Sequence, residues 1–305
     1  MGRFVKWPQM NPDAGLPGRT GDFLELMRFD KPVGTLLLLW PTLTALWLAA
    51  DGTPSPRVIL IFTLGVIVMR AAGCVINDYA DRDLDGGVLR TRHRPITEGR
   101  ISPHEALLTF AALGLVAFML VLMTNPLTIA LSLVGLVLAF VYPFMKRYTH
   151  LPQVVLGMAW AWAIPMAFAA QTGAVVSGIW VFYFAVVLWT VAFDTFYAMV
   201  DREDDKKMGI KSTAILFDDL DLGIIALLQG LTLLALILTG QSFNRGLWYF
   251  AGVGVMAVMF LYQQIIARNR EPDRCFRAFR SNNWAGLVMF LGILLDTYHG
   301  QAPLA

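Results

Sequence analysis

The feature that most constrains this chain is a run of nine apolar segments, each close to the length that a helix needs to cross a lipid bilayer. They occupy residues 33–50, 57–78, 104–123, 126–145, 152–171, 176–198, 221–240, 246–267 and 281–298. Lipid offers the backbone no hydrogen-bond partners, so a segment that crosses it must be a helix or a strand of a closed barrel. Barrel strands need only about ten residues, and these segments are longer. We therefore predict an all-α polytopic membrane protein with nine transmembrane helices.

The charged residues agree with a membrane location and predict an orientation. Only 15% of the residues are charged, against about a quarter in soluble domains. Of the 24 Lys and Arg residues, 21 lie in the N-terminal segment or after the second, fourth, sixth and eighth apolar segments; Arg57 and Arg245 lie on the other side, and Arg70 lies within the second segment. Cytoplasmic loops carry the excess of positive charge, so we expect the N-terminus in the cytoplasm and the C-terminus outside. The net charge of +2 is too small to indicate a nucleic-acid partner.

The ends of the chain and its cysteines suggest one membrane domain. Residues 1–21 are expected to form a flexible tail and residues 22–305 a single transmembrane domain. Residues 22–31 are amphipathic, which predicts a short helix lying on the membrane surface. Cys74 and Cys275 make no disulfide framework, and we expect both to be free thiols.

Three aspartates close the second apolar segment at a spacing that places them on one face of a helix. Asp78, Asp81 and Asp85 form this first acidic stripe, and Asn77 lies at its edge. Carboxylates so close together repel one another unless a cation joins them. Mg²⁺ is usually held by one or two carboxylates together with substrate phosphates, so the stripe predicts a site for a Mg²⁺–diphosphate complex. The alternative is a solvated acidic loop that pairs with neighbouring arginines.

A second acidic stripe closes the sixth apolar segment. Asp194 and Asp201 are seven residues apart, and Asp201 and Asp205 are four apart, so all three share one helix face. The charge asymmetry puts both stripes on the cytoplasmic side. Both belong to long connections, residues 79–103 and 199–220, which we expect to cap the site, because long loops in compact proteins tend to be functional. Two stripes on one side favour a shared binding site over two solvated loops.

Basic residues near the stripes are further candidates. Arg70 lies inside an apolar segment, where charge is costly and often functional, so it either contacts a substrate or pairs with an aspartate. Tyr142 and Lys146 form a Y-x-x-x-K pattern, followed by Arg147. Lys146 could bind diphosphate as a point charge, and Arg147 could hold a carboxylate through its guanidinium fork. The alternative is that both are ordinary basic residues at a cytoplasmic helix end.

Three stretches resemble the motifs of the UbiA superfamily of intramembrane prenyltransferases. NDYADRDLD at residues 77–85 resembles its first aspartate motif, YPFMK at residues 142–146 its Y-x-x-x-K motif, and DREDD at residues 201–205 its second aspartate motif. Longer stretches, such as DKPVGTLLLLWPTLTALWLA, extend the resemblance over nearly the whole chain after about residue 22. It implies nine transmembrane helices around a central cavity, capped by two cytoplasmic loops, in a bacterial inner membrane.

The resemblance also implies a reaction and its substrates. A polyprenyl group would pass from polyprenyl diphosphate to C3 of 4-hydroxybenzoate, giving 3-polyprenyl-4-hydroxybenzoate and diphosphate in ubiquinone biosynthesis. Ionisation of the diphosphate, assisted by Mg²⁺, would leave an allylic cation. The acceptor ring would then attack this cation in an electrophilic aromatic substitution. No obligate protein partner is expected.

The motifs distribute the expected roles among named residues. The expected Mg²⁺ ligands are Asp78, Asp81, Asp85, Asp201 and Asp205. The expected substrate contacts are Asn77, Arg70, Arg82, Arg94, Lys146, Arg147 and Lys211. The expected catalytic group is Asp194, Arg147, Tyr142 and Lys146. Within it, Arg147 would bind the acceptor carboxylate, and Asp194 would bind the phenol or take the departing proton.

Other functions predict different sequence features. Prenylation of another acceptor, as in menaquinone, haem O or tocopherol pathways, would not need a basic site for a carboxylate. A CDP-alcohol phosphotransferase is expected to contain D-G-x-x-A-R with paired aspartates downstream, and this order is absent from the sequence. A cation transporter is expected to place its acids near the bilayer midplane, whereas these lie at the cytoplasmic ends of the segments.

Overall fold

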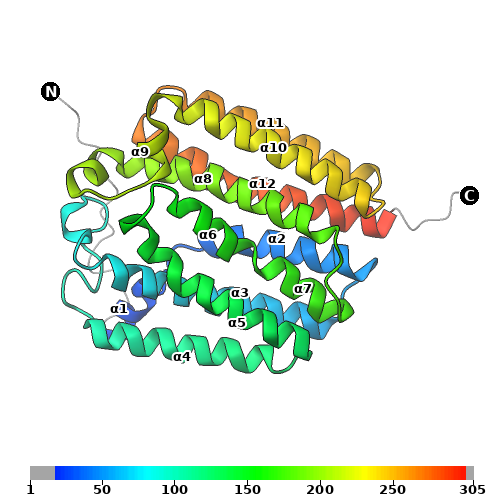
Figure 1. The fold of residues 1–305 in the computed structure, drawn as a ribbon, viewed down its shortest axis with the longest axis horizontal. Helices are drawn as coiled ribbons and strands as arrows, with labels where there is room; N and C mark the ends of the chain where they lie inside the picture. Colours follow the sequence, from blue (N-terminus) through cyan, green and yellow to red (C-terminus); the bar gives the residue numbers. More distant parts are fainter. Residues whose placement is uncertain (1–17, 300–305) are drawn as a thin grey trace, which may run out of the picture.

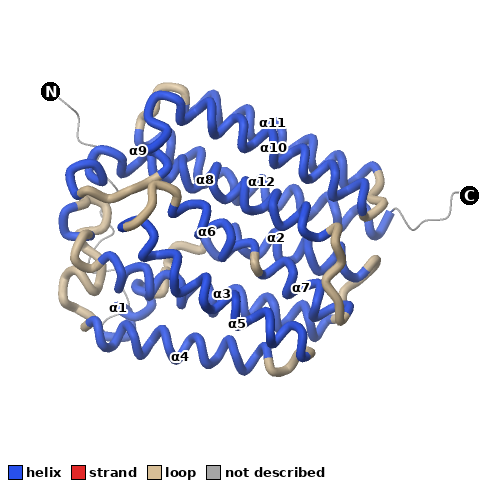
Figure 2. The backbone as a smooth tube through the Cα atoms, in the orientation of Figure 1, coloured by secondary structure: helices blue, strands red, loops and turns tan. Residues whose placement is uncertain are grey.

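The computed structural model describes residues 18–299, and every regular element in that range is a helix (Figures 1 and 2). The α-helices are α1 (Arg19–Leu26), α2 (Val33–Ala50), α3 (Pro56–Asp81), α4 (Pro103–Val121), α5 (Pro126–Val141), α6 (Pro152–Ala161), α7 (Ala163–Thr172), α8 (Ile179–Met208), α9 (Thr213–Phe217), α10 (Asp221–Ser242), α11 (Leu247–Ala267) and α12 (Pro272–His299). Three short 3₁₀ helices are η2 (Asp85–Gly87), η3 (Tyr142–Arg147) and η4 (Asp218–Leu220). The all-α prediction is confirmed. Most of the predicted tail, residues 1–17, lies outside the described residues.

Local sequence signals fix where several helices begin. Proline is the first residue of α3, α4, α5, α6 and α12, where its missing N–H costs nothing and its fixed φ suits the helix. Ser102 caps α4 by accepting a hydrogen bond from the backbone N–H of Glu105, whose side chain accepts from the backbone N–H of Ser102. This reciprocal capping box satisfies donors that a helix start otherwise leaves unpaired.

Eight stretches of the described chain are long and apolar enough to cross a membrane. They are Val33–Ala50, Pro56–Asp81, Pro103–Val121, Pro126–Arg147, Pro152–Thr172, Ile179–Met208, Thr213–Ser242 and Leu247–Ala267. The chain is therefore a multi-pass membrane protein. α12, the ninth predicted span, begins with a polar stretch and packs on α2, α8 and α11. Its 28 residues are long enough to cross a bilayer, and its status as a ninth span stays a prediction.

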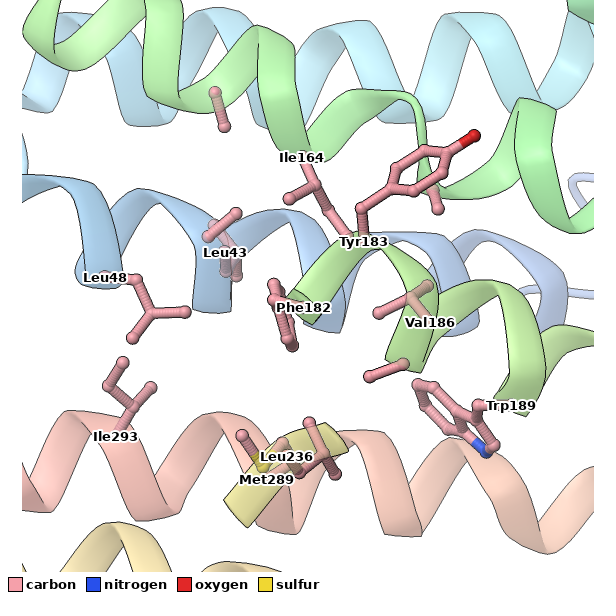
Figure 3. Close-up of a cluster of buried hydrophobic side chains, with 14 of the residues drawn as sticks. Leu43, Leu48, Ile164, Phe182, Tyr183, Val186, Trp189, Leu236, Met289 and Ile293 are labelled. Atoms are coloured by element: carbon pink, nitrogen blue, oxygen red, sulfur yellow. The ribbon is translucent and has the colours of Figure 1, made fainter. Parts of the chain in front are cut away.

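The long helices lie side by side, with α8 at the centre of the bundle (Figure 1). The most apolar part of α8 is 72% buried, whereas the corresponding parts of α4 and α5 are 11% buried. α8 packs on α6, α10 and α12. Large apolar side chains from α2, α7, α8 and α12 meet there, including Phe182, Trp189 and Ile293 (Figure 3). The second acidic stripe therefore lies on the most enclosed helix of the protein.

Prolines interrupt the α-helix in two of the predicted spans. The segment at residues 152–171 divides into α6 and α7 at Trp162, three residues before Pro165. The segment at residues 126–145 leaves α5 at Val141 and continues as η3, whose second residue is Pro143. A proline removes a donor and its ring clashes with the carbonyl four residues earlier, so an α-helix seldom passes it unchanged.

The acidic stripes lie further inside the helices than the predicted boundaries suggest. α3 continues to Asp81 and α8 to Met208, so the first residues of the expected caps at 79–103 and 199–220 are still helical. The helix expected at residues 22–31 is shorter, because α1 ends at Leu26 and Arg28 takes a left-handed φ of 59°. Leu26 is fully buried in a cluster that includes Val75. α1 is thereby packed at the end of the bundle that carries both stripes.

Candidate active site

The first acidic stripe is buried at the end of α3. Asp78 and Asp81 occupy its last turn and Asp85 opens η2, and they are 1%, 3% and 5% exposed. Asn77 donates a hydrogen bond from Nδ2 to Oδ2 of Asp81 at 3.3 Å. Burial raises the pKa of the Asp85 carboxyl above its usual value, and the charge of Arg94 partly offsets that rise. Three carboxylates buried this closely require positive charge beside them.

Basic side chains supply that charge in the structure. Nη1 of Arg94 lies 3.0 Å from Oδ1 of Asp78 and 2.8 Å from Oδ2 of Asp85. The same nitrogen lies 3.9 Å from Oδ2 of Asp81, so one guanidinium contacts the whole stripe. Arg28, just beyond α1, donates from Nη2 to both carboxylate oxygens of Asp78 at 3.0 and 2.9 Å.

The second stripe faces the first across further cations. Arg90 donates from Nε and Nη2 to the carboxylate of Asp201 at 2.5 to 3.1 Å, and its guanidinium lies 4.6 Å from the ring centre of Tyr197. Lys146 forms an ion pair with Asp81 and also interacts electrostatically with Asp205. Asp205 is 8% exposed. The two stripes thus line one buried charged region.

The loop between η2 and α4 lies across the ends of α3 and α8. Gly87 sits so close to α8 that a Cβ atom would approach Sδ of Met208 to 2.2 Å. The backbone N–H of Leu89 donates to Oδ2 of Asp204 at 3.4 Å. This loop also carries Arg90, which contacts the second stripe, and Arg94, which contacts the first. It therefore has the position expected of a cap.

Arg70 lies deeper in the bundle, about two turns before Asp78 on α3. It donates a hydrogen bond to Sγ of Cys74, and its guanidinium lies 5.7 Å from the ring centre of Trp160. Its Nε is buried and has no hydrogen-bond partner among residues 18–299. Gly34 makes room for the guanidinium, because a Cβ there would lie 2.4 Å from Nε. Across the described chain Arg70 forms no ion pair, so the structure does not show the predicted alternative of a salt bridge to an aspartate.

Asp194 and Tyr142 also lie at this deeper level. Asp194 is on α8, about two turns before Asp201, and its carboxylate interacts with the side chain of Gln153. The hydroxyl of Tyr142 donates to the carbonyl of Gly73 at 3.1 Å. Cys74 and Cys275 are buried free thiols, as predicted. Asp194 and Tyr142 thus mark a deeper part of the site, further from the helix ends than Asp201 and Asp205.

Three of the predicted substrate contacts lie at the outer edge of the site, which we call the rim. Arg147 is exposed and donates to the carbonyl of Ala80. Arg82 lies over the ring of Tyr79 at 4.5 Å and pairs with Asp83. Nζ of Lys211 donates to the carbonyl of Tyr148 at 3.3 Å. In this arrangement none of the three side chains is bonded to a stripe carboxylate.

The stripes provide donors suited to Mg²⁺. Within the described part of the chain, no three His, Cys, Asp or Glu side chains converge at metal-ligand distances, and basic side chains lie among the carboxylates instead. Oδ1 of Asp81 is buried without a hydrogen-bond partner in the same range. An all-carboxylate donor set with a free buried oxygen fits a hard cation that prefers oxygen ligands.

Arg28, Arg90 and Gln153 are site residues that no motif of the sequence identifies. Arg28 comes from outside the motifs, and only its position before Pro32 marks a helix end. Arg90 is one of the arginines that the solvated-loop alternative pairs with the first stripe, and its position in the sequence does not predict a contact with Asp201. Gln153 begins α6 without a distinguishing pattern. Each becomes a candidate through a tertiary contact between distant parts of the chain.

Comparisons with known proteins agree with this architecture. The model of the UbiA prenyltransferase family matches residues 38–294. A 4-hydroxybenzoate octaprenyltransferase of Saccharophagus degradans is 60% identical over 285 residues, covering 93% of this chain and 95% of the relative. A 4-hydroxybenzoate octaprenyltransferase of Pseudomonas aeruginosa is 55% identical over 287 residues, covering 94% of this chain and 97% of the relative.

Solved structures share the fold at lower sequence identity. The apo structure of a UbiA homolog from Aeropyrum pernix K1 has a TM-score of 0.77 at 23% identity, covering 86% of this chain and 97% of that one. A UbiA homolog from Archaeoglobus fulgidus bound to GPP and Mg²⁺ has a TM-score of 0.72 at 20% identity, covering 91% and 99%. The expected helical architecture is therefore one found in solved proteins.

Proposed function

The chain belongs to the UbiA prenyltransferase family, and from that premise we propose that it transfers a polyprenyl group from polyprenyl diphosphate to C3 of 4-hydroxybenzoate. The products are 3-polyprenyl-4-hydroxybenzoate and diphosphate, as a step of ubiquinone biosynthesis. The observation that carries the proposal is the pair of acidic stripes facing one buried region, in a chain 60% identical to a 4-hydroxybenzoate octaprenyltransferase.

The stripes are the proposed diphosphate site. Asp78, Asp81 and Asp85 would hold one Mg²⁺, and Asp201 and Asp205 a second. These carboxylates would hold the ions where Mg²⁺ would neutralise the negative charge that develops on the departing diphosphate. The proposed protein contacts to the diphosphate are Asn77, Arg82, Arg90, Arg94, Lys146 and Lys211. Arg94 and Lys146 already lie among the carboxylates, so they are placed to turn from the aspartates to a bound diphosphate.

The proposed acceptor site lies deeper, beside Arg70 and Asp194. The family motifs predict that Arg147 binds the acceptor carboxylate. In the structure, however, the Arg147 guanidinium is exposed and donates to a backbone carbonyl. Arg70 has an unpartnered buried Nε and forms no ion pair within residues 18–299. A buried guanidinium gains most from a carboxylate ligand that it binds through two hydrogen bonds. The geometry therefore favours Arg70 as the carboxylate anchor and leaves Arg147 at the rim.

The proposed chemistry uses both the diphosphate site at the stripes and the deeper acceptor site. The C–O bond to diphosphate breaks heterolytically, and the bonding electrons leave with the diphosphate. The apolar bundle excludes water from the allylic cation, and aromatic rings such as Trp160 stabilise positive charge through their faces. C3 of the acceptor forms the new C–C bond, and the ring proton at C3 then leaves. Asp194 would accept the phenol hydrogen bond or that proton, with Tyr142 beside it.

The membrane orientation and domain limits belong to the same proposal. The excess of Lys and Arg supports placing the N-terminus and both stripes on the cytoplasmic side of a bacterial inner membrane, with the C-terminus in the periplasm. Residues 22–305 would form one catalytic domain after a tail at residues 1–21, whose last three residues already belong to α1. The loop that contains Arg90 and Arg94 would cap the site from the cytoplasm.

A transfer assay tests the proposal. Membranes containing the protein are incubated with Mg²⁺, geranyl diphosphate and ring-labelled 4-hydroxybenzoate, beside an Asp78→Ala variant. We expect a labelled, lipid-extractable product that disappears with EDTA and in the variant. Labelled phenol lacking the carboxylate serves as the second acceptor. Equal transfer to phenol, or transfer that persists in EDTA, would contradict the proposed site.

A further inference from the structure

Gln153 lies at the start of α6 and points toward α8. It is 6% exposed. One turn further along α6, Gly157 lies so close to α8 that a Cβ would be 3.0 Å from the carbonyl oxygen of Val187. Residues four apart share a helix face, so the tight packing at Gly157 also directs Gln153 at α8. There it lies beside Asp194, which follows Val187 by two helical turns on the same face of α8.

The two ends of the Gln153 amide have different and fixed partners. Its Oε1 accepts a hydrogen bond from the backbone N–H of Thr213 at 3.1 Å. A backbone N–H can only donate, so this contact determines which end of the amide is oxygen. The Nε2 end therefore faces Asp194 and can only donate to it. Asp194 is consequently held as a hydrogen-bond acceptor.

Thr213 is itself fixed by a buried network. The hydroxyl of Thr195 donates to the carbonyl of Val191 at 2.6 Å and lies 2.8 Å from the hydroxyl of Thr213. Because the single Thr195 proton is used, Thr213 is the donor between the two hydroxyls. Thr195 and Thr213 are fully buried. The residue that holds Gln153 is therefore itself held by a buried hydrogen bond.

The same segment reaches the first acidic stripe. The backbone N–H of Lys211 donates to the carbonyl of Lys146 at 3.1 Å. Lys146 forms an ion pair with Asp81. Gln153 thus connects Asp194 to a segment that also contacts the diphosphate end of the site.

We propose that Gln153 is a positioning residue for the acceptor half of the reaction. Its Nε2 binds one carboxylate oxygen of Asp194 and leaves the other oxygen directed at the acceptor. This inference rests on the proposed function, because it assigns Asp194 to the phenol or to the departing proton. Without the amide, the Asp194 side chain can rotate, and a reacting pair that is misplaced by about 1 Å loses about 100-fold in rate.

The test compares two substitutions of Gln153 with a matched control. Gln153→Glu keeps the size of the side chain and an oxygen for the Thr213 N–H, but replaces the donor that faces Asp194. Gln153→Leu removes both hydrogen bonds. Gln229→Leu is the control, because Gln229 is another buried glutamine in an interhelical bond, to Gln263 at 2.8 Å, on helices outside the site.

Steady-state transfer is measured with geranyl diphosphate, 4-hydroxybenzoate and Mg²⁺. Both Gln153 variants are expected to lower kcat by about 10- to 100-fold, and Gln229→Leu to leave it unchanged. Diphosphate release without acceptor, the KM for geranyl diphosphate and Mn²⁺ binding should match the wild type. These readouts separate a positioning role from a general structural one.

Each contrary outcome has a distinct meaning. A wild-type kcat in both Gln153 variants would refute the positioning role alone. Equal losses in transfer and in acceptor-independent diphosphate release would also refute it, because the defect would then lie outside the acceptor step. If one variant does not fold, as judged by thermal unfolding, the other decides. Absence of product from the wild type would refute the proposed function itself.

Discussion

Removing the charge of Arg94 should make the acidic stripe bind a divalent cation more tightly when no substrate is present. One nitrogen of this guanidinium lies 3.0, 3.9 and 2.8 Å from carboxylate oxygens of Asp78, Asp81 and Asp85. A cation that binds these oxygens must displace the guanidinium. In an Arg94→Gln protein that competitor is absent.

The expected size of the effect follows from the contacts that are lost. Arg94 makes one charge-assisted hydrogen bond, to Asp85 at 2.8 Å, and a close ion pair with Asp78 at 3.0 Å. Its side chain is 12% exposed, so solvent screens it little. A hydrogen bond to a charged group contributes about 1.5–3 kcal/mol. A displaced Arg94 side chain regains part of that free energy by hydrogen-bonding to water. We therefore take the free energy of one such bond as the net cost of displacing Arg94 from the carboxylates. This corresponds to cation binding that is about 10- to 100-fold tighter.

Mn²⁺ titration followed by electron paramagnetic resonance measures this directly, on protein in lipid nanodiscs without substrate. Arg92→Gln is the matched control: it removes the same charge from the same loop, but Arg92 is exposed and bonds to His93. With an unreactive prenyl diphosphate analogue present, Arg94→Gln should bind the analogue more weakly than the control. Mn²⁺ affinity in Arg94→Gln no higher than in Arg92→Gln would refute the competition between guanidinium and metal.

Three further substitutions separate the site from the scaffold. Asp81→Asn removes the carboxylate with a free buried oxygen and should lower Mg²⁺-dependent transfer by about 100-fold or more in the product assay; activity within a few fold of wild type would contradict it. Gly34→Ala places a Cβ 2.4 Å from Nε of Arg70 and should lower kcat/KM for 4-hydroxybenzoate by about tenfold with little change in thermal unfolding. Asp296 accepts from the backbone N–H groups of Gly246 and Tyr249 at the start of α11, so Asp296→Ala should destabilise the protein by about 1–2 kcal/mol and leave kcat unchanged.

The helices and the stripes were predictable because their signals are local. Apolar length, proline at helix starts and the spacing of acids act within one segment, and α2 begins and ends where the sequence predicts, at Val33 and Ala50. Boundaries shifted where polar residues continue a helix beyond the apolar run, as at Asp201 to Met208 in α8. A count based on hydropathy ends such a helix too early, because it measures apolarity rather than helix formation.

The partners of the charged residues were not predictable, because they depend on contacts between distant segments. Arg28 and Asp78 are 50 residues apart, and Arg90 and Asp201 are 111 apart. Spacing placed Arg147 and Lys146 together at one helix end, but the 3₁₀ geometry of η3 directs them differently: Lys146 reaches Asp81, whereas Arg147 reaches the carbonyl of Ala80. Periodicity identifies a face of an element, and only the packing of elements shows what that face meets.

The most direct measurement of the proposed reaction uses 4-hydroxybenzoate with deuterium at C3 and C5. The protein is incubated with this acceptor, geranyl diphosphate and Mg²⁺, and the product is analysed by mass spectrometry. Transfer to C3 breaks one C–D bond, so the product should carry one deuterium and should not form in EDTA. A product that keeps both deuterium atoms would mean transfer to an oxygen or to another ring carbon and would contradict transfer to C3. No product from folded protein would contradict the proposed reaction.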